Sequence, residues 1–237
     1  MRIPQPVADA FRGRQFKPTV ILLVSCLLLL AWKYFCSADI YAYYFEMSGP
    51  RVATPQVIGA ILYFVSCFLL MGAVPVFIIK RVLGERLRDY GAGFGFRKRT
   101  LRSFLILAPV FLLAGYIGSK DASLLDKFPI NPEAGQSALM FALHAATMLL
   151  FYVGWEFYFR GFMLFGLRDS LGDANAVLVQ MLASALLHIG DPASEVFGAV
   201  FAGLLWGMLA LRTRSVLSGM GQHYLLGISL DWFICYG

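Results

Sequence analysis

The chain alternates long apolar stretches with short polar ones, and seven of the apolar stretches are long enough to cross a membrane. A spanning helix needs about 20 mainly apolar residues. The qualifying stretches lie at residues 19–35, 56–79, 101–118, 137–167, 174–190, 192–211 and 215–236. The pattern therefore predicts an all-α, polytopic integral membrane protein.

The fourth stretch, residues 137–167, is too long for one straight span. At about 1.5 Å per residue it would run about 46 Å, whereas the hydrocarbon core of a bilayer is about 30 Å thick. We therefore expect a break or an interfacial turn before Gly154. This break would raise the count from seven to eight transmembrane helices.

Composition strengthens the membrane assignment, because 59% of the residues are hydrophobic and only 14% are charged. A soluble chain of this size needs more charge to cover its surface. We expect one membrane domain over residues 1–237, with N-terminal spans and a basic loop in 1–136 and a core in 137–237. Nothing in the pattern specifies an oligomeric state.

Basic residues cluster on one side of the predicted spans, 15 against 4, with Arg160 left inside the membrane. The positive-inside rule then predicts a cytoplasmic N-terminus and location in the plasma (inner) membrane. The net charge of +6 is explained by contact with membrane lipid, so we expect no nucleic-acid partner. The larger group includes Arg2, Arg12, Arg14, Lys17, Lys80, Arg81, Arg86, Arg88, Arg97, Lys98, Arg99, Arg102, Arg168, Arg212 and Arg214, and the smaller comprises Lys33, Arg51, Lys120 and Lys127.

Ionisable residues inside the last four segments are the candidates for function, because such groups are costly in a bilayer and persist mainly when paired or functional. The polar residues between the fourth and fifth stretches predict a turn near Leu171, and Glu156 lies 15 residues before this turn and His188 17 residues after it. In an antiparallel hairpin this spacing puts both at about 22 to 26 Å along the helices, so they are expected to face each other. The same counting places Arg160 and His223 together in the layer just below.

Glu156 and Arg160 are spaced i,i+4, which places them on one helix face and predicts an ion pair. A fixed, buried carboxylate near a histidine can activate water, while a second histidine polarises a peptide carbonyl. Glu156, His188 and His223 would also make a plausible set of zinc ligands. Because no HExxH spacing places two ligands on one helix, we expect no cofactor or metal.

Several further polar residues have simpler structural explanations. Asp191, which precedes Pro192, is expected to cap a helix N-terminus, and Glu195 then lies in the first turn, where the helix dipole favours a carboxylate. Asp231 is expected near the outer end of its helix, either solvated or functional. We interpret His144 as structural. Asp191, Glu195 and Asp231 remain secondary site candidates, and the spacing of Ala199, Gly203 and Gly207 predicts close helix packing.

The motifs of the last 90 or so residues resemble those of the CAAX protease and bacteriocin-processing (CPBP, or Abi) family of intramembrane endopeptidases. The matching pieces are Trp155–Phe162, His188 with Asp191 and Glu195, and His223. The resemblance implies that Glu156 and His188 activate water, that Arg160 orients Glu156 and that His223 contacts the substrate carbonyl. Three residues depart from the family pattern: Trp155 for its first glutamate, Ser184 for a phenylalanine and Gly227 for an asparagine.

The leading functional hypothesis is therefore an intramembrane endopeptidase that acts on a peptide or a protein's C-terminal segment, with Glu156, Arg160, His188 and His223 at its site. A non-catalytic membrane scaffold or immunity protein of the same fold is a second hypothesis. A transporter that uses the buried charges as an ion or proton relay is a third. The lack of a repeated half argues against the transporter.

Overall fold

The computed structural model describes residues 9–46 and 54–237, so Arg2 and Arg51 of the charge count lie outside the described residues. Within those ranges the chain is helical and contains no strand, which confirms the predicted fold class. The principal elements are α2 (Phe16–Phe35), α3 (Ala38–Glu46), α4 (Pro55–Cys67), η2 (Phe68–Ala73), α5 (Val74–Phe77), η3 (Ile78–Val82), η4 (Leu87–Tyr90), α6 (Arg97–Gly118), α7 (Ala122–Leu125), α8 (Ala138–Glu156), η6 (Phe157–Met163), α9 (Leu164–Leu187), α10 (Ala193–Thr213) and α11 (Leu217–Tyr236).

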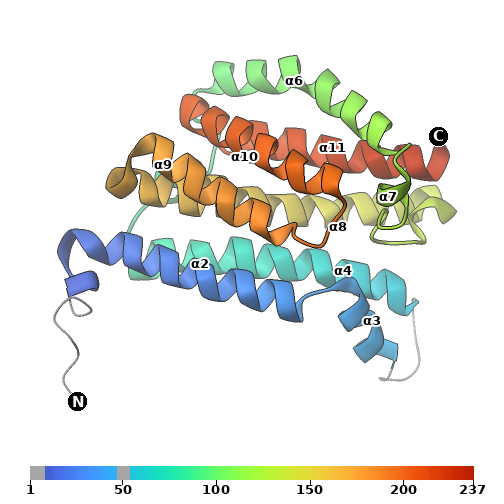
Figure 1. Cartoon of the computed structure of the whole chain (residues 1–237), viewed down its shortest axis with the longest axis horizontal. Helices are drawn as coiled ribbons and strands as arrows, with labels where there is room; N and C mark the ends of the chain where they lie inside the picture. The colour runs from blue at the N-terminus through green and yellow to red at the C-terminus, as the bar shows by residue number, and fades with distance from the viewer. Residues whose placement is uncertain (1–8, 47–53) are drawn as a thin grey trace.

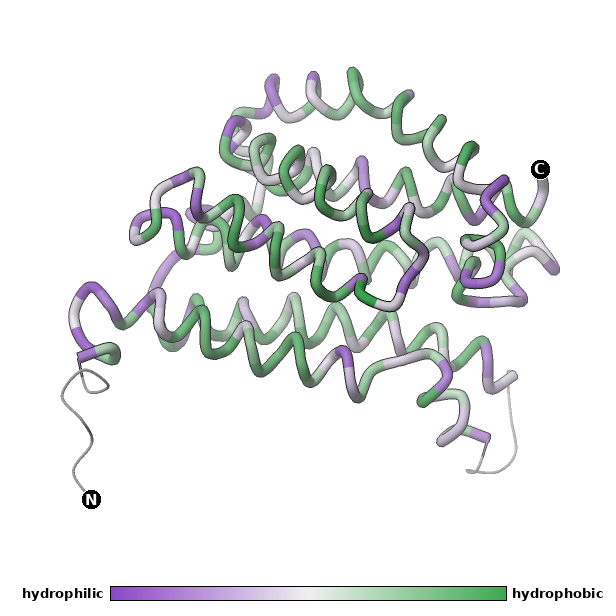
Figure 2. The backbone as a smooth tube through the Cα atoms, viewed as in Figure 1, coloured by the Kyte–Doolittle hydropathy of each residue, from purple (hydrophilic) through white to green (hydrophobic). Residues whose placement is uncertain are grey.

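Five helical stretches of the described chain are long and apolar enough to cross a membrane: Gly13–Phe35, Pro55–Val82, Arg97–Gly118, Ala138–Leu187 and Ala193–Thr213. Their outer surfaces carry exposed apolar side chains such as Leu27, Leu105 and Phe201, as expected of helices that face lipid. Figure 2 shows hydrophobic residues along the helices and many of the hydrophilic ones at the turns and ends. Helix α11 lies alongside them with a more polar sequence and is not among the five.

The expected break before Gly154 is wrong. Helix α8 runs unbroken through Gly154 and continues as the π-helical segment η6 and the first part of α9. The turn expected near Leu171 is confirmed, because the chain reverses at Gly172, whose φ of 78° and ψ of 160° are non-helical, so that Ala138–Leu187 forms two antiparallel arms (Figure 1). Glycine tolerates this backbone conformation because it has no Cβ. The fourth stretch, residues 137–167, is therefore continuous and helical from Ala138 onward.

Helix α8 occupies the centre of the bundle, between α4 and α11 (Figure 1). At Gly154 a Cβ atom would lie 2.8 Å from the Cα of Phe68, so the two backbones cross there in direct contact. The predicted close packing of α10 is also confirmed. A Cβ at Gly203 would lie 2.8 Å from Cγ of Met181, and Gln180 of α9 donates a hydrogen bond of 2.8 Å to the carbonyl of Gly203.

Basic residues from distant parts of the sequence meet at one end of the bundle. Lys17, Arg88, Arg168 and Arg214 line one hollow there, together with the carboxylates of Glu85, Asp89 and Asp169. Lys17 and Glu85 form an ion pair of 2.9 Å. These four basic residues, which the sequence assigns to the same side of the membrane, therefore lie at the same end of the bundle.

Candidate active site

Glu156 lies at the end of α8 and is fully buried between α8, η6 and α11. Its Oε1 atom is 3.1 Å from Nη1 of Arg160, so the predicted ion pair is confirmed. The same Oε1 is 2.8 Å from Nδ1 of His223 on α11. Glu156 is 0% exposed and Arg160 2% exposed, so this carboxylate meets protein groups and not solvent. Glu156 can therefore orient His223, but it does not itself reach the cavity.

The indole of Trp206 on α10 supports this pair from the far side. The ring centroids of Trp206 and His223 are 4.2 Å apart. The guanidinium carbon of Arg160 lies 5.4 Å from the ring centroid of Trp206. The Nε1 atom of Trp206 donates a hydrogen bond of 3.0 Å to the side chain of Gln222. Trp206 thus fixes both partners of Glu156. Sequence reasoning missed Trp206, because a tryptophan in an apolar helix carries no functional signal.

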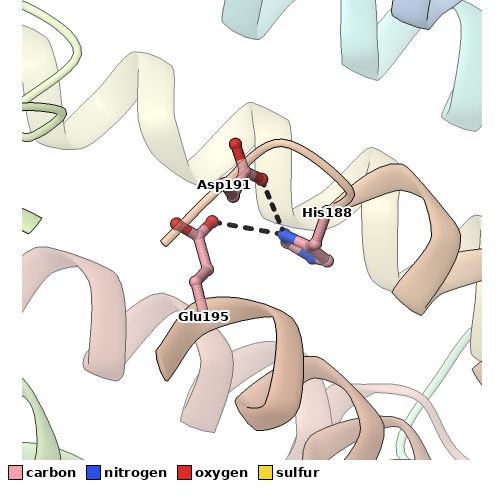
Figure 3. A group of neighbouring side chains, drawn as sticks. All are labelled: His188, Asp191 and Glu195. Atoms are coloured by element: carbon pink, nitrogen blue, oxygen red, sulfur yellow. Dashed lines mark hydrogen bonds and ion pairs between the residues drawn. The ribbon is translucent and has the colours of Figure 1, made fainter. Parts of the chain in front are cut away.

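His188 lies at the C-terminal end of α9 and faces a different set of partners (Figure 3). Its Nδ1 is 3.2 Å from Oδ2 of Asp191 and 3.2 Å from Oε1 of Glu195. Lys127, from the loop after α7, is 2.9 Å from Asp191 and 2.8 Å from Glu195. Lys33 of α2 holds this turn by donating a hydrogen bond of 2.7 Å to the carbonyl of Leu187.

Depth counting predicted that Glu156 faces His188 and that Arg160 and His223 share the layer below. The structure pairs these residues differently. Glu156 contacts His223, whereas the α8 residue that meets His188 is Trp155, with 5.7 Å between their ring centroids. Consecutive residues on a helix point about 100° apart. Trp155 accordingly faces α9 while Glu156 faces α11. The indole stands where the family pattern has a glutamate, and the carboxylates beside His188 come from Asp191, before α10, and Glu195, in its first turn.

Asp191 and Glu195 both belong to the site, and their expected structural roles need revision. Asp191 makes no capping bond to α10, whose N-cap is Pro192, and its carboxylate bonds His188 and Lys127 instead. Glu195 does lie in the first turn of α10, as expected, but it contacts the same two cationic groups. Lys127 was not predicted, since a single loop lysine has no distinguishing sequence context.

Asp231 lies apart from this site. It is 0% exposed, and its Oδ2 atom is 2.7 Å from Nε2 of His144, which is also buried. The expectation of a solvated carboxylate is therefore wrong, while the structural interpretation of His144 agrees with its position. This second histidine–carboxylate pair links α8 and α11 a few turns from Glu156 and His223.

One cavity of about 230 Å³ joins the two histidines. Its walls are mainly aromatic and aliphatic, and its polar lining includes His188, His223, Asp191, Glu195 and Lys127. Each histidine has Nδ1 on a carboxylate, while no hydrogen bond to Nε2 of His188 or His223 occurs in the described part of the chain. The Nε2 atoms are thus the groups free to act on a molecule in this cavity.

The charged groups around the two histidines differ. Asp191 and Glu195 place two negative charges within hydrogen-bond distance of Nδ1 of His188, and Lys127 and Lys33 bring positive charge to the same turn. Burial lowers the pKa of His188, but hydrogen bonds to Asp191 and Glu195 and their charges outweigh it and raise the pKa above its usual 6.5. Around His223, Arg160 already neutralises Glu156, so a neutral imidazole leaves no net buried charge.

The residues that could hold a metal ion are paired with protein cations in this structure. The predicted trio of Glu156, His188 and His223 is divided, because Glu156 is engaged by Arg160 and His223. His188, Asp191 and Glu195 do bring ligand atoms within 4.8 Å of one another. However, the ammonium of Lys127 already lies against both carboxylates at 2.8 and 2.9 Å. It supplies the positive charge that a cation would bring.

Comparison with known proteins covers the segment that carries both histidines of this site. Residues 136–228 match the model of a protein family described as type II CAAX prenyl endopeptidase Rce1-like. No curated protein and no solved structure matches the chain. The matched range contains Glu156, Arg160, His188 and His223, and it agrees with the resemblance drawn from their motifs.

Proposed function

We propose that the chain is an intramembrane endopeptidase with a two-histidine site, because residues 136–228 match the family described as type II CAAX prenyl endopeptidase Rce1-like. The observation that carries the proposal is that one cavity is lined by both histidines, each with Nδ1 on a carboxylate and with no hydrogen bond to Nε2 among the described residues. The proposed substrate is a peptide, or the C-terminal segment of a protein, with an apolar portion that suits the aromatic walls.

In the proposed mechanism His223 is the general base. Glu156 accepts the Nδ1 proton of His223 in a hydrogen bond, which leaves the Nε2 lone pair directed to water. The water oxygen bonds to the scissile carbonyl carbon, its proton passes to Nε2, and the carbonyl electron pair moves to oxygen. The resulting oxyanion accepts a hydrogen bond from Nε2–H of the His188 imidazolium. Collapse breaks the C–N bond, and the proton held by His223 goes to the leaving amine.

These roles differ from those that the resemblance implies, under which Glu156 and His188 activate water. Glu156 becomes a positioning residue because it is wholly buried and acts through His223. His188 becomes the electrophilic partner because two carboxylates favour its cationic form. Two titratable groups whose surroundings favour opposite protonation states are a common arrangement for an acid and a base.

We further propose that the basic end of the bundle faces the cytoplasm, with the protein in the plasma (inner) membrane. Lys17, Arg88, Arg168 and Arg214 meet at that end, where anionic lipid headgroups of the inner leaflet would attract them. The N-terminus would then be cytoplasmic.

A reconstituted preparation tests the proposed activity. Purified protein in liposomes is incubated with quenched fluorescent peptides that end in Cys-aliphatic-aliphatic-X, in S-farnesylated and unmodified forms, with and without 1,10-phenanthroline. We expect cleavage that requires His223 and is unchanged by the chelator, since Lys127 takes the position of a cation. Cleavage lost on chelation and restored by zinc would contradict the metal-free mechanism.

The pH dependence of cleavage tests the state of His188. Because its carboxylate partners raise its pKa, the imidazolium persists to higher pH than an isolated histidine, and activity falls only as pH rises through that raised value. Replacing Glu195 by glutamine removes one negative partner and lowers the pKa of His188. We expect the high-pH limb of the kcat/KM profile to move to lower pH in Glu195→Gln. A profile with an unmoved high-pH limb would show that His188 does not act as the acid.

A non-catalytic membrane protein is the second candidate, and Trp155 is the observation that favours it. An indole lies against His188 where the family pattern has a glutamate. Under this alternative, wild type and His223→Ala would be equally inactive on every peptide of the series while both remain folded.

A further inference from the structure

Tyr152 of α8 lies one turn before Glu156 and extends its hydroxyl over Gly227 of α11. A Cβ atom built on residue 227 would overlap that hydroxyl oxygen and would also lie 2.8 Å from Cε of Met148. Only glycine leaves this space free. The family pattern has an asparagine at the position of Gly227. In this structure the hydroxyl of Tyr152 lies where the side chain of that asparagine would begin.

The Tyr152 side chain belongs to the cavity of the two histidines. It lines that cavity, and its ring centroid is 4.5 Å from that of His223. The residue is 7% exposed, so its ring is held by its neighbours. Within the described residues the Tyr152 hydroxyl makes no hydrogen bond. Its oxygen also retains some accessible surface, because it is not one of the inaccessible polar atoms that lack a partner. A hydroxyl that is positioned but unpaired is available to a molecule in the cavity.

We propose that Tyr152 is a further catalytic residue, whose hydroxyl donates a hydrogen bond to the scissile carbonyl oxygen as that oxygen becomes an oxyanion. The proposal rests on the proposed proteolytic function. Tyr152 keeps its proton throughout, so no bond of the tyrosine forms or breaks. Together with Nε2–H of His188 it would give the oxyanion two donors, which is the usual way that a developing negative charge is stabilised.

The test is Tyr152→Phe, which removes the hydroxyl and keeps the ring against His223. Loss of one oxyanion donor typically lowers kcat by about 10²- to 10³-fold. We expect a decrease of that order in kcat, with KM nearly unchanged. Tyr224→Phe is the matched control, because Tyr224 lies 6.0 Å from Tyr152 between ring centroids but donates its hydroxyl to the carbonyl of Ala145. Full activity of Tyr152→Phe would overturn the proposal while leaving the protease intact.

A binding measurement separates this inference from the proposed function. The probe is an S-farnesyl peptide with a phosphinate in place of its scissile amide, which carries negative oxygens where the oxyanion would form. We expect Tyr152→Phe to bind it at least about 10-fold more weakly than wild type, in the range of a lost hydrogen bond to a charged group. If Tyr152→Phe binds the probe more weakly but wild type cleaves no peptide, the hydrogen-bond role of Tyr152 stands and the proposed protease activity is refuted. Equal binding, or none to either protein, would overturn the role of Tyr152.

Discussion

His223→Gln should lose about 10³-fold in kcat, whereas His188→Gln should lose only about 10-fold. Removal of a general base typically costs 10²- to 10⁴-fold, and a glutamine amide cannot take a proton from water. At residue 188 the amide still offers an N–H donor, so part of the stabilisation of the oxyanion survives. The measurement is kcat and KM for both variants on the same cleaved peptide.

The ranking of these two variants decides the roles of the histidines. If His188→Gln is the more severely affected, His188 is the base, and the assignment implied by the family motifs is correct. His144→Gln is the matched control, since His144 is buried against Asp231 and does not line the cavity. Its kcat should stay near that of wild type, even if the pair contributes to stability.

Glu156→Leu should destabilise the protein by about 3–5 kcal/mol, the usual cost of leaving one member of a buried ion pair without its partner. Arg160 is 2% exposed and its charge partner is Glu156, at 3.1 Å. Without the carboxylate, a guanidinium would remain buried near His223. The free energy of unfolding is measured by titration with sodium dodecyl sulfate in mixed micelles.

The double variant Glu156→Leu/Arg160→Met is the control for this prediction. Replacing both members of a buried pair by apolar groups is often close to neutral for stability. We therefore expect the double variant to unfold near wild type, although it should lack cleavage because nothing orients His223. A single variant as stable as the double would show that Arg160 finds another partner or solvent.

The secondary structure follows from properties that are local in sequence. Apolar stretches of about 20 residues must be helical in a bilayer, because lipid offers no hydrogen-bond partners to the backbone. The i,i+4 contact of Glu156 with Arg160 depends only on helical periodicity, and the structure reproduces it. The close packing at Gly203 is likewise local, since small residues at a spacing of four make a smooth helix face.

The segment around Gly154 shows where reasoning from length alone was insufficient. The bilayer thickness predicts a break in a stretch as long as residues 137–167, but a helix longer than the membrane can also tilt or project beyond it. The turn near Leu171 was predicted from the polar residues that separate two apolar stretches, and the structure places it at Gly172. The continuity of α8 through Gly154 depends instead on its packing against α4 and α11.

The sequence by itself determined that this chain is a helical membrane protein and which helices carry its ionisable groups. Only the tertiary structure decided that Glu156 meets His223, that Trp155 meets His188, and that Lys127 joins Asp191 and Glu195. The physical reason is that counting residues gives a height along a helix, whereas partnership also depends on how each helix is rotated about its axis. That rotation is fixed by packing against all of its neighbours at once.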